Sequence, residues 1–248
     1  MDPGIPSEPP SCSLKGKTAI VTGAGCLGDG IGNGRAISIL LADDGCDVLC
    51  VNLNIEWAKK TVEMIASKPG RGEALPFCAD VASMECCKAV LHYAMEQFGG
   101  LDILVNNVGV AGASGTAVDV DMAEWAKRCW AEGGTPHLLY PTAKGAVVNL
   151  THAMAAHHAS EGIRVNCVCP GMLYTPMMYG NGMSEEAREA RRKRSLLGTE
   201  GNGWDCAGAV VFLAGPHARW MTGVILPVDA GTTAAVGIGM SKSASVNG

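Results

Sequence analysis

The sequence lacks any uninterrupted apolar run of the roughly 20 residues needed to span a bilayer. Its first thirteen residues, MDPGIPSEPPSCS, also lack the basic and apolar regions of a signal peptide. No strong excess of one charge is present, because the net charge is only -5 at pH 7, which would not attract nucleic acid or an anionic membrane. We therefore expect a cytoplasmic protein that acts on small molecules, with no nucleic-acid or membrane partner.

Paired cysteines at metal-binding spacing are also missing. The chain has 11 cysteines, an odd number, and none of them form a C-x-x-C pair. Neither Cys86-Cys87 nor Cys167-x-Cys169 has the spacing of a zinc site. We expect reduced thiols that behave mostly as small buried hydrophobic residues, and no metal.

Length and composition favour one domain, because 248 residues with 48% hydrophobic residues can form one sizeable core. Residues 1–13 are rich in proline and serine, and residues 237–248 carry no periodic apolar pattern. We interpret these segments as a flexible N-terminal extension and a C-terminal tail, with residues 14–236 as the folded part.

Short apolar runs alternate with longer amphipathic stretches along the folded part. The runs predict strands near residues 18–25, 47–54, 74–80, 101–107, 163–171 and 223–231. The stretches between them predict helices near residues 34–45, 56–68, 84–99, 144–162 and 205–215. This order predicts an α/β fold with right-handed crossovers and a doubly wound, mostly parallel sheet.

Glycines gather in TAIVTGAGCLGDGIGNGRA, where the first predicted strand ends and a helix begins. A phosphate can approach backbone N–H groups and a helix N-terminus at this position, so the turn favours a dinucleotide site. Glycines alone are weak support, because any tight turn uses their backbone freedom.

This turn resembles the cofactor loop T-G-x-x-x-G-x-G of the short-chain dehydrogenase/reductase family. Other family motifs follow in order over nearly the whole folded chain: CADV, N-N-V-G in place of N-N-A-G, Tyr140-x-x-x-Lys144, Asn166 in RVN, Pro170-Gly171 with Thr175-Pro176, and Val228-Asp229. The resemblance implies a Rossmann-like fold, an NAD or NADP cofactor and cofactor contacts from Gly23, Gly28, Gly30, Ile31, Gly32, Asn52, Asp80, Val81, Asn107, Gly109, Tyr140, Lys144, Pro170, Gly171 and Thr175.

Two registers of the cofactor loop stay open. Six residues separate Thr22-Gly23 from Gly30-Ile31-Gly32, so the loop is about three residues longer than the family pattern. Gly28 could instead fill the second glycine position.

The end of the second predicted strand bears on the choice of cofactor. An acid there favours NAD, and a basic residue accommodates the extra phosphate of NADP. Here the residue is Asn52, followed by Leu53 and Asn54. Asparagine does not repel a phosphate, but no base stands beside it, which favours NAD slightly.

Tyr140 and Lys144 lie one turn apart if a helix covers residues 140–155, with Pro141 tolerated in its first turn. A phenol has a pKa of about 10, and a nearby ammonium favours its ionised form. The resemblance implies that Tyr140 exchanges a proton with the substrate oxygen, and that Lys144 supports it and holds the ribose.

The interval before Tyr140 departs from the family. About thirty residues separate it from Asn107, roughly half of the usual interval, so the family's helix asparagine and its catalytic serine have no match. We expect one helix and one central strand to be missing or rearranged, which would leave neighbouring strands with unpaired backbone groups. Thr135, His137 and Cys129 can form hydrogen bonds, but none has the spacing of the serine. The missing helix normally builds a subunit interface, so we do not expect the family's usual tetramer, whereas the C-terminal strand and its helix could still support a homodimer.

Residues 172–200 resemble the family's substrate lid and contain Met172, Tyr174, Met177, Met178 and Tyr179, which suit either an apolar pocket or ordinary packing. Three hypotheses follow. The first is NAD(P)-dependent interconversion of a secondary alcohol and a ketone on an apolar small molecule, with Tyr140 and Lys144 as catalytic residues. The second is a non-redox isomerase or cyclase on the same scaffold, and the third is an inactive shortened variant.

Overall fold

The structure is a computed structural model that describes residues 8–109, 139–180 and 182–234. Its strands are β1 (Thr18–Thr22), β2 (Asp47–Asn52), β3 (Ala74–Cys78), β4 (Ile103–Val105), β5 (Cys167–Pro170) and β6 (Ile225–Val228). Its described helices are α1 (Asn33–Asp43), α2 (Ile55–Ala66), α3 (Met84–Phe98), α5 (Leu139–His157), α6 (Pro176–Tyr179), α7 (Glu185–Arg192) and α8 (Gly203–Ala214), with short 3-10 helices at Ala159–Glu161 and Pro216–Ala218. Each strand and helix predicted from the apolar pattern is present.

The strands form parallel ladders. Four of them have the order β3-β2-β1-β4, with Val21 of β1 opposite Cys50 of β2 and Val105 of β4. β5 pairs with β6 in a second parallel ladder that begins with Cys167 opposite Ile225. The predicted α/β class with a parallel, doubly wound sheet is confirmed.

Alternate residues of β1 and β2 supply two cores, because successive side chains of a strand point to opposite faces. Ala19 and Val21 pack with α1, α2 and Ala207 of α8 on one face. Ile20 packs with Val90 and Ala94 of α3 on the other. Helices therefore cover both faces of the four-stranded ladder.

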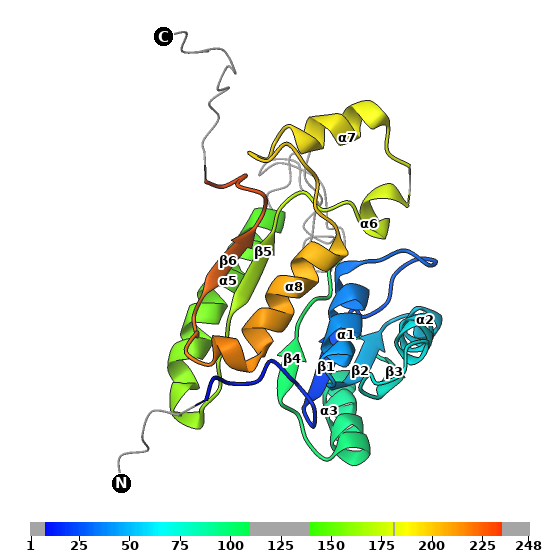
Figure 1. Ribbon diagram of the computed structural model, residues 1–248, viewed down its shortest axis with the longest axis vertical. Helices are drawn as coiled ribbons and strands as arrows, with labels where there is room; N and C mark the ends of the chain where they lie inside the picture. Colours follow the sequence, from blue (N-terminus) through cyan, green and yellow to red (C-terminus); the bar gives the residue numbers. More distant parts are fainter. Residues whose placement is uncertain (1–7, 110–138, 181, 235–248) are drawn as a thin grey trace.

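Helix α8 lies beside α1 and joins the two ladders (Figure 1). The contact is close at the start of α8, where a Cβ atom on Gly203 would lie 3.0 Å from the carbonyl oxygen of Ile31. Helix α5 packs against β5. Because α8 contacts α1, β5 and β6, it holds the β5-β6 ladder against the rest of the fold.

No pairing joins β4 to β5 in the part of the chain that the structure describes. Among the described residues, β4 pairs with β1 alone and β5 pairs with β6 alone. This lack of pairing lies where we expected a missing or rearranged central strand. The segment that the expectation concerns, residues 110–138, lies outside the described residues.

The cysteines correct one expectation. Of those described, Cys46, Cys50 and Cys206 are buried, whereas Cys12 and Cys78 are exposed and the others lie between. The prediction that most cysteines are buried is therefore wrong, because several lie on helix and strand positions near solvent. Burial raises the pKa of the Cys46 and Cys50 thiols to about 12, which makes both unreactive at neutral pH.

Candidate functional site

The turn between β1 and α1 is tightly packed. Gly23 has a φ of 66°, in the region that favours glycine, and starts the turn directly after β1. A Cβ atom on Gly34, in the first turn of α1, would lie 2.0 Å from the carbonyl oxygen of Gly23. Only glycine fits at this helix position, which brings the N-terminus of α1 directly against the turn.

Gly28, Gly30 and Gly32, whose places in the cofactor loop the sequence did not decide, differ in their surroundings. Gly32 is the N-cap of α1, and Gly30 packs against Pro176 of α6, where an added Cβ atom would lie 2.4 Å from the proline Cγ. Gly28 has a φ of 61° and no neighbour within 4 Å of an added Cβ atom. Gly32 therefore stands directly before the first residue of α1, and Gly28 and Gly30 lie in the loop that leads to it.

Sequence reasoning missed Gly34. The run Gly30-Ile31-Gly32-Asn33-Gly34 contains two overlapping G-x-G patterns, and only the packing against Gly23 shows that the later one also meets the turn. The repeated spacing was the available signal.

Asn107 ties the end of β4 to this turn. Its Nδ2 donates to the carbonyl oxygens of Thr22 and Gly23, both at 3.1 Å, and its backbone N–H donates to Thr22 Oγ1 at 3.1 Å. Thr22 Oγ1 in turn donates to Val105 O at 3.2 Å. The carboxyl ends of β1 and β4 are thereby fixed together. Gly109 is the last described residue before the gap.

At the end of β2, Asn52 is buried and its side chain is occupied by the protein. Its Nδ2 donates to Gly25 O at 3.3 Å, and its Oδ1 accepts from Asn54 N at 2.9 Å. At the end of β3, Asp80 is exposed, and its Oδ1 accepts from Ala82 N at 3.0 Å, with Val81 half-buried beside it. All three predicted residues lie at the carboxyl edge of the ladder.

Helix α5 carries Tyr140 in its first turn and Lys144 one turn later. The side chain of Tyr140 lies outside the described part of the structure. Burial lowers the pKa of Lys144, and the nearby thiols of Cys167 and Cys169 on β5 act in the opposite direction. Those two sulfur atoms are 3.8 Å apart, and their effect on Lys144 places its ammonium near β5.

The residues that follow β5 hold a second close approach. Pro170 ends β5, and a Cβ atom on Gly171 would lie 2.7 Å from the Cα of Asp229, so this position requires glycine. Asp229 closes its own turn by accepting from Gly231 N at 2.9 Å and from Thr233. Thr175 is buried and is the N-cap of α6.

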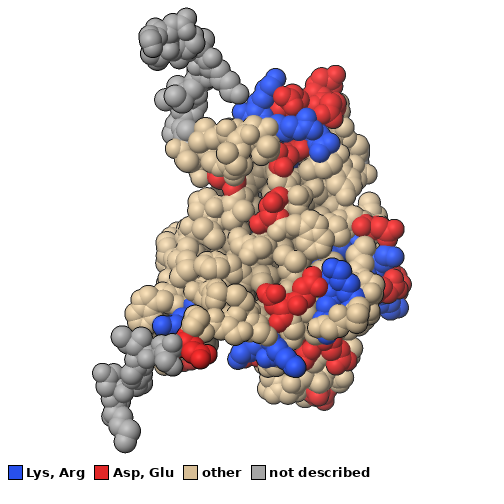
Figure 2. Space-filling model, viewed as in Figure 1, with Lys and Arg blue, Asp and Glu red and all other residues tan. Residues whose placement is uncertain are grey.

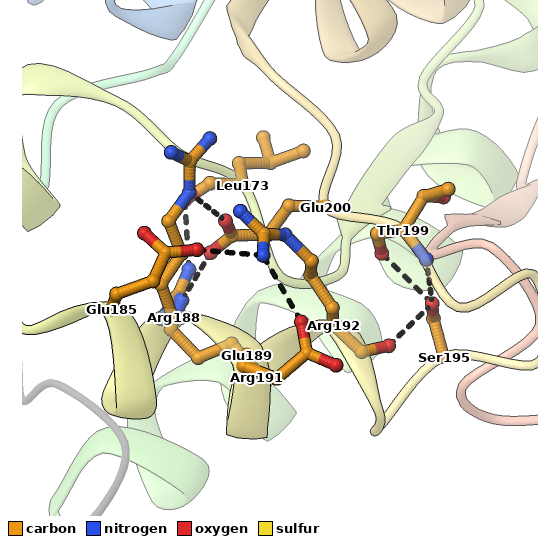
Figure 3. A network of polar contacts seen from close by, with 9 residues as sticks. All are labelled: Leu173, Glu185, Arg188, Glu189, Arg191, Arg192, Ser195, Thr199 and Glu200. Atoms are coloured by element: carbon orange, nitrogen blue, oxygen red, sulfur yellow. Dashed lines mark hydrogen bonds and ion pairs between the residues drawn. The ribbon is translucent and has the colours of Figure 1, made fainter.

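The segment after Thr175 is anchored by a buried carboxylate (Figure 3). Glu200, whose side chain is 3% exposed, accepts from Arg188 Nε at 3.0 Å and from Arg191 Nε at 2.6 Å. Arg191 also donates to Leu173 O at 2.8 Å, and the Arg188 guanidinium lies 3.9 Å from the centre of the Tyr174 ring. The charges of α7 alone would suggest a solvated face. Arg188 and Arg191 instead bind Glu200 and so anchor the predicted lid.

Three candidates for the missing serine, Thr135, His137 and Cys129, lie outside the described residues. None of the described helices is both long and apolar enough to cross a bilayer.

Comparison with known proteins matches both halves of the chain to related families. The model described as short chain dehydrogenase matches residues 17–130, and the one described as enoyl-(acyl carrier protein) reductase matches residues 131–233. The meso-2,3-butanediol dehydrogenase of Serratia marcescens is 30% identical, over 89% of this chain and 96% of the relative. The 2-(R)-hydroxypropyl-CoM dehydrogenase of Xanthobacter autotrophicus is 33% identical, over 88% of this chain and 99% of the relative.

A solved structure agrees. The crystal structure of a dehydrogenase/reductase from Sinorhizobium meliloti is 31% identical, with a TM-score of 0.77, over 90% of this chain and 97% of that chain. The chain belongs to the short-chain dehydrogenase/reductase family and is an oxidoreductase of that family.

Proposed function

We propose that this protein interconverts a secondary alcohol and a ketone on an apolar small molecule, with NAD or NADP as the cofactor. The observation that carries the proposal is the closed turn at the carboxyl ends of β1 and β4, where Asn107 holds Gly23 against the start of α1. Doubly wound sheets bind their ligands at this edge.

The residues at this edge fit a dinucleotide. The N-terminus of α1 suits a pyrophosphate. Asn33 Oδ1, in the first turn of α1, is buried and has no partner among the described residues. An unpartnered buried acceptor is costly, and a water or a hydroxyl group of a bound dinucleotide could donate to it, whereas the pyrophosphate itself could not. We assign the pyrophosphate to Gly30, Ile31, Gly32 and the neighbouring turn, and the adenosine half to Asn52, Asp80 and Val81.

The nicotinamide half would lie toward Gly109, Pro170, Gly171 and Thr175. When bound, this group accepts or donates the hydride. The chain's own residues would handle the proton, with Tyr140 as the acid or base for the substrate oxygen. The Lys144 ammonium would favour the phenolate, although its own burial disfavours the charged form.

We favour NAD over NADP. Asn52 is already bonded to Gly25 and Asn54, and Leu53 and Asn54 supply no cation for a further phosphate. The relatives' names, butanediol and hydroxypropyl-CoM dehydrogenases, suggest a secondary alcohol as substrate. Met172, Met177 and the tyrosines of the lid supply the apolar lining for it.

Turnover of a secondary alcohol with NAD or NADP tests this proposal. The purified protein is incubated with NAD or NADP and a panel of secondary alcohols, including 2,3-butanediol, and absorbance of the reduced nicotinamide is followed. Tyr140→Phe is expected to lower kcat by at least about 100-fold, the scale of general acid–base catalysis. Tyr93→Phe is the matched control, because Tyr93 packs on Phe77 at α3, away from the site. Equal rates in the two variants would refute the role of Tyr140.

The absence of pairing between β4 and β5 among the described residues favours a second candidate, an inactive or non-redox variant. The family places its substrate-binding serine on a strand between the β4 and β5 positions, and the described residues leave these two strands unpaired with each other. Cofactor binding without turnover of any alcohol or ketone would support this candidate.

A further inference from the structure

Arg35 is the largest fully buried side chain among the described residues. It lies in the first turn of α1, directly beneath the glycine-rich turn. Its Nε donates to Thr61 Oγ1 at 3.1 Å, its Nη1 donates to Gly28 O at 2.8 Å and to Gly30 O, and its Nη2 donates to Cys26 O at 3.2 Å. One guanidinium thus binds three alternate carbonyl groups of the loop.

The charge of this guanidinium has no carboxylate partner among the described residues, because all of its acceptors are neutral. The acid of the loop, Asp29, has a side chain that is 80% exposed and pairs with Lys60 at 3.2 Å. Burial of a cation without a counter-charge is costly. The fold nevertheless keeps a positive charge under the loop.

The carbonyl groups fix the direction of the amides. Each described peptide bond is trans, so the C=O and the following N–H of a peptide point in opposite directions. Because the carbonyls of Cys26, Gly28 and Gly30 point at Arg35, the N–H groups that follow them, on residues 27, 29 and 31, point away from it. None of these three N–H groups donates to a described residue. The loop therefore turns away from Arg35 three N–H groups that have no acceptor among the described residues, and the positive charge of Arg35 lies behind them.

Thr61 connects Arg35 and the glycine-rich loop to α2. Its Oγ1 accepts from Arg35 and donates to Ala24 O at 2.8 Å. The beginning of the loop and its middle are thus held by one buried pair. Arg35 and Thr61 therefore support from inside a loop that is longer than the family pattern.

We propose that Arg35 is the positioning residue of the cofactor loop: it holds the loop carbonyls inward, and its charge favours an anionic pyrophosphate at the outward amides. This inference rests on the proposed function for the identity of the ligand. It also makes a prediction for inorganic pyrophosphate alone, which needs no nicotinamide chemistry.

The experiment compares Arg35→Met, Arg35→Lys and the control Ser38→Ala with the wild type. Ser38 is equally buried on α1, and its hydroxyl donates to Gly34 O rather than to the carbonyls of Cys26, Gly28 or Gly30. The Kd for NADH and NADPH is measured from nicotinamide fluorescence at several salt concentrations. The thermal midpoint is measured with sodium pyrophosphate and with sodium sulfate at equal ionic strength.

We expect Arg35→Met to raise the Kd for the reduced cofactors at least about tenfold and to make that Kd less dependent on salt. Pyrophosphate should no longer raise the thermal midpoint of this variant. Arg35→Lys should keep the salt dependence and bind with intermediate affinity, because lysine keeps the positive charge but lacks the planar set of N–H donors of the guanidinium. Ser38→Ala should bind like the wild type. Should Arg35→Met not fold, Arg35→Lys decides: affinity equal to the wild type contradicts the positioning role.

The two proposals fail separately. Wild-type protein that binds neither reduced cofactor, but is stabilised by pyrophosphate only while Arg35 is present, contradicts the proposed function and supports the role of Arg35. Wild-type protein that binds cofactor with a Kd that Arg35→Met leaves within twofold keeps the proposed function and overturns the role of Arg35.

Discussion

At the scale of single residues, Gly34 shows how one missing side chain permits the site. Because Gly34 has no Cβ atom, α1 can begin against the carbonyl oxygen of Gly23. The N–H groups of the first turn of α1 therefore lie at the carboxyl edge of the sheet. The same glycine in the middle of an exposed helix would be a cost, because glycine weakens helices.

A pair of alanine substitutions tests this distinction. Gly34→Ala should destabilise the fold by about 3 kcal/mol, since its Cβ atom would meet backbone. Gly208→Ala on α8 should stabilise it by about 0.5–1 kcal/mol, since an added Cβ atom there meets nothing within 4 Å. Urea unfolding of both variants measures the difference, and equal stabilities would contradict the packing at the turn.

Asp102 lies immediately before β4 and is held by two donors from the start of the fold. Burial raises the pKa of this carboxyl, but the hydrogen bonds from Lys17 Nζ, at 2.7 Å, and from Thr18 N, at 3.0 Å, outweigh it, so the pKa is below its ordinary 3.8. A lowered folded pKa means that the ionised group stabilises the protein above pH 3.8, and that this contribution is lost as pH falls through the folded pKa.

Asp102→Asn should therefore cost about 1 kcal/mol at pH 7, a small value because the side chain is 35% exposed and screened. The cost should vanish at pH values below the folded pKa. Chemical unfolding from pH 7 to pH 2 measures it, with Glu56→Gln, which removes an exposed pair with Lys59, as the control. A cost that persists in acid would show that the charge is not responsible.

At the scale of elements, Glu200 decides where α7 lies. It binds two arginines of that helix, whereas Glu189 within α7 is half-exposed and pairs with Arg192. Removal of one partner of a buried pair costs about 3–5 kcal/mol, and the partial exposure of Arg188 reduces this value.

Glu200→Gln should accordingly raise amide hydrogen exchange of residues 185–192 by about tenfold or more, with a smaller change elsewhere. Glu189→Gln should leave exchange nearly unchanged, because exposed pairs contribute little. Mass spectrometry of exchanged peptides compares the two variants. Equal exchange in both would mean that Glu200 does not anchor α7.

The elements themselves were largely predictable from the sequence. β1 and β2 are continuous apolar runs because both of their faces are buried. Serine is a favoured N-cap residue, and Ser184 caps α7 by accepting from Ala187 N. Contacts between distant segments were not predictable. Arg35 has the helix spacing of an ordinary α1 residue, and Glu200 has no local pattern. Their burial depends on loops that close over them, for which a local sequence window holds no signal.

At the scale of the whole molecule, charged side chains gather over α7 and around α2 and α3, whereas the surface over α8 and β6 carries few (Figure 2). Phe212 of α8 is 46% exposed and Trp204 is 39% exposed. If the C-terminal strand and its helix support a dimer, this face would form the contact.

Light scattering after size exclusion should therefore give twice the mass of one chain, not four times. Phe212→Glu should give a monomer, and Leu91→Glu on α3, at the same 46% exposure, should leave the dimer intact. A tetramer, or equal effects of the two substitutions, would contradict this assignment.

Binding of a nicotinamide dinucleotide at the β1-α1 turn is the central claim, and titration of the purified protein with NADH and NADPH, followed by nicotinamide fluorescence, tests it most directly. We predict saturable binding, tighter for NADH than for NADPH, that Tyr140→Phe leaves largely intact while it removes turnover. No saturable binding of either dinucleotide would contradict the account and leave a short-chain dehydrogenase/reductase scaffold without its cofactor site.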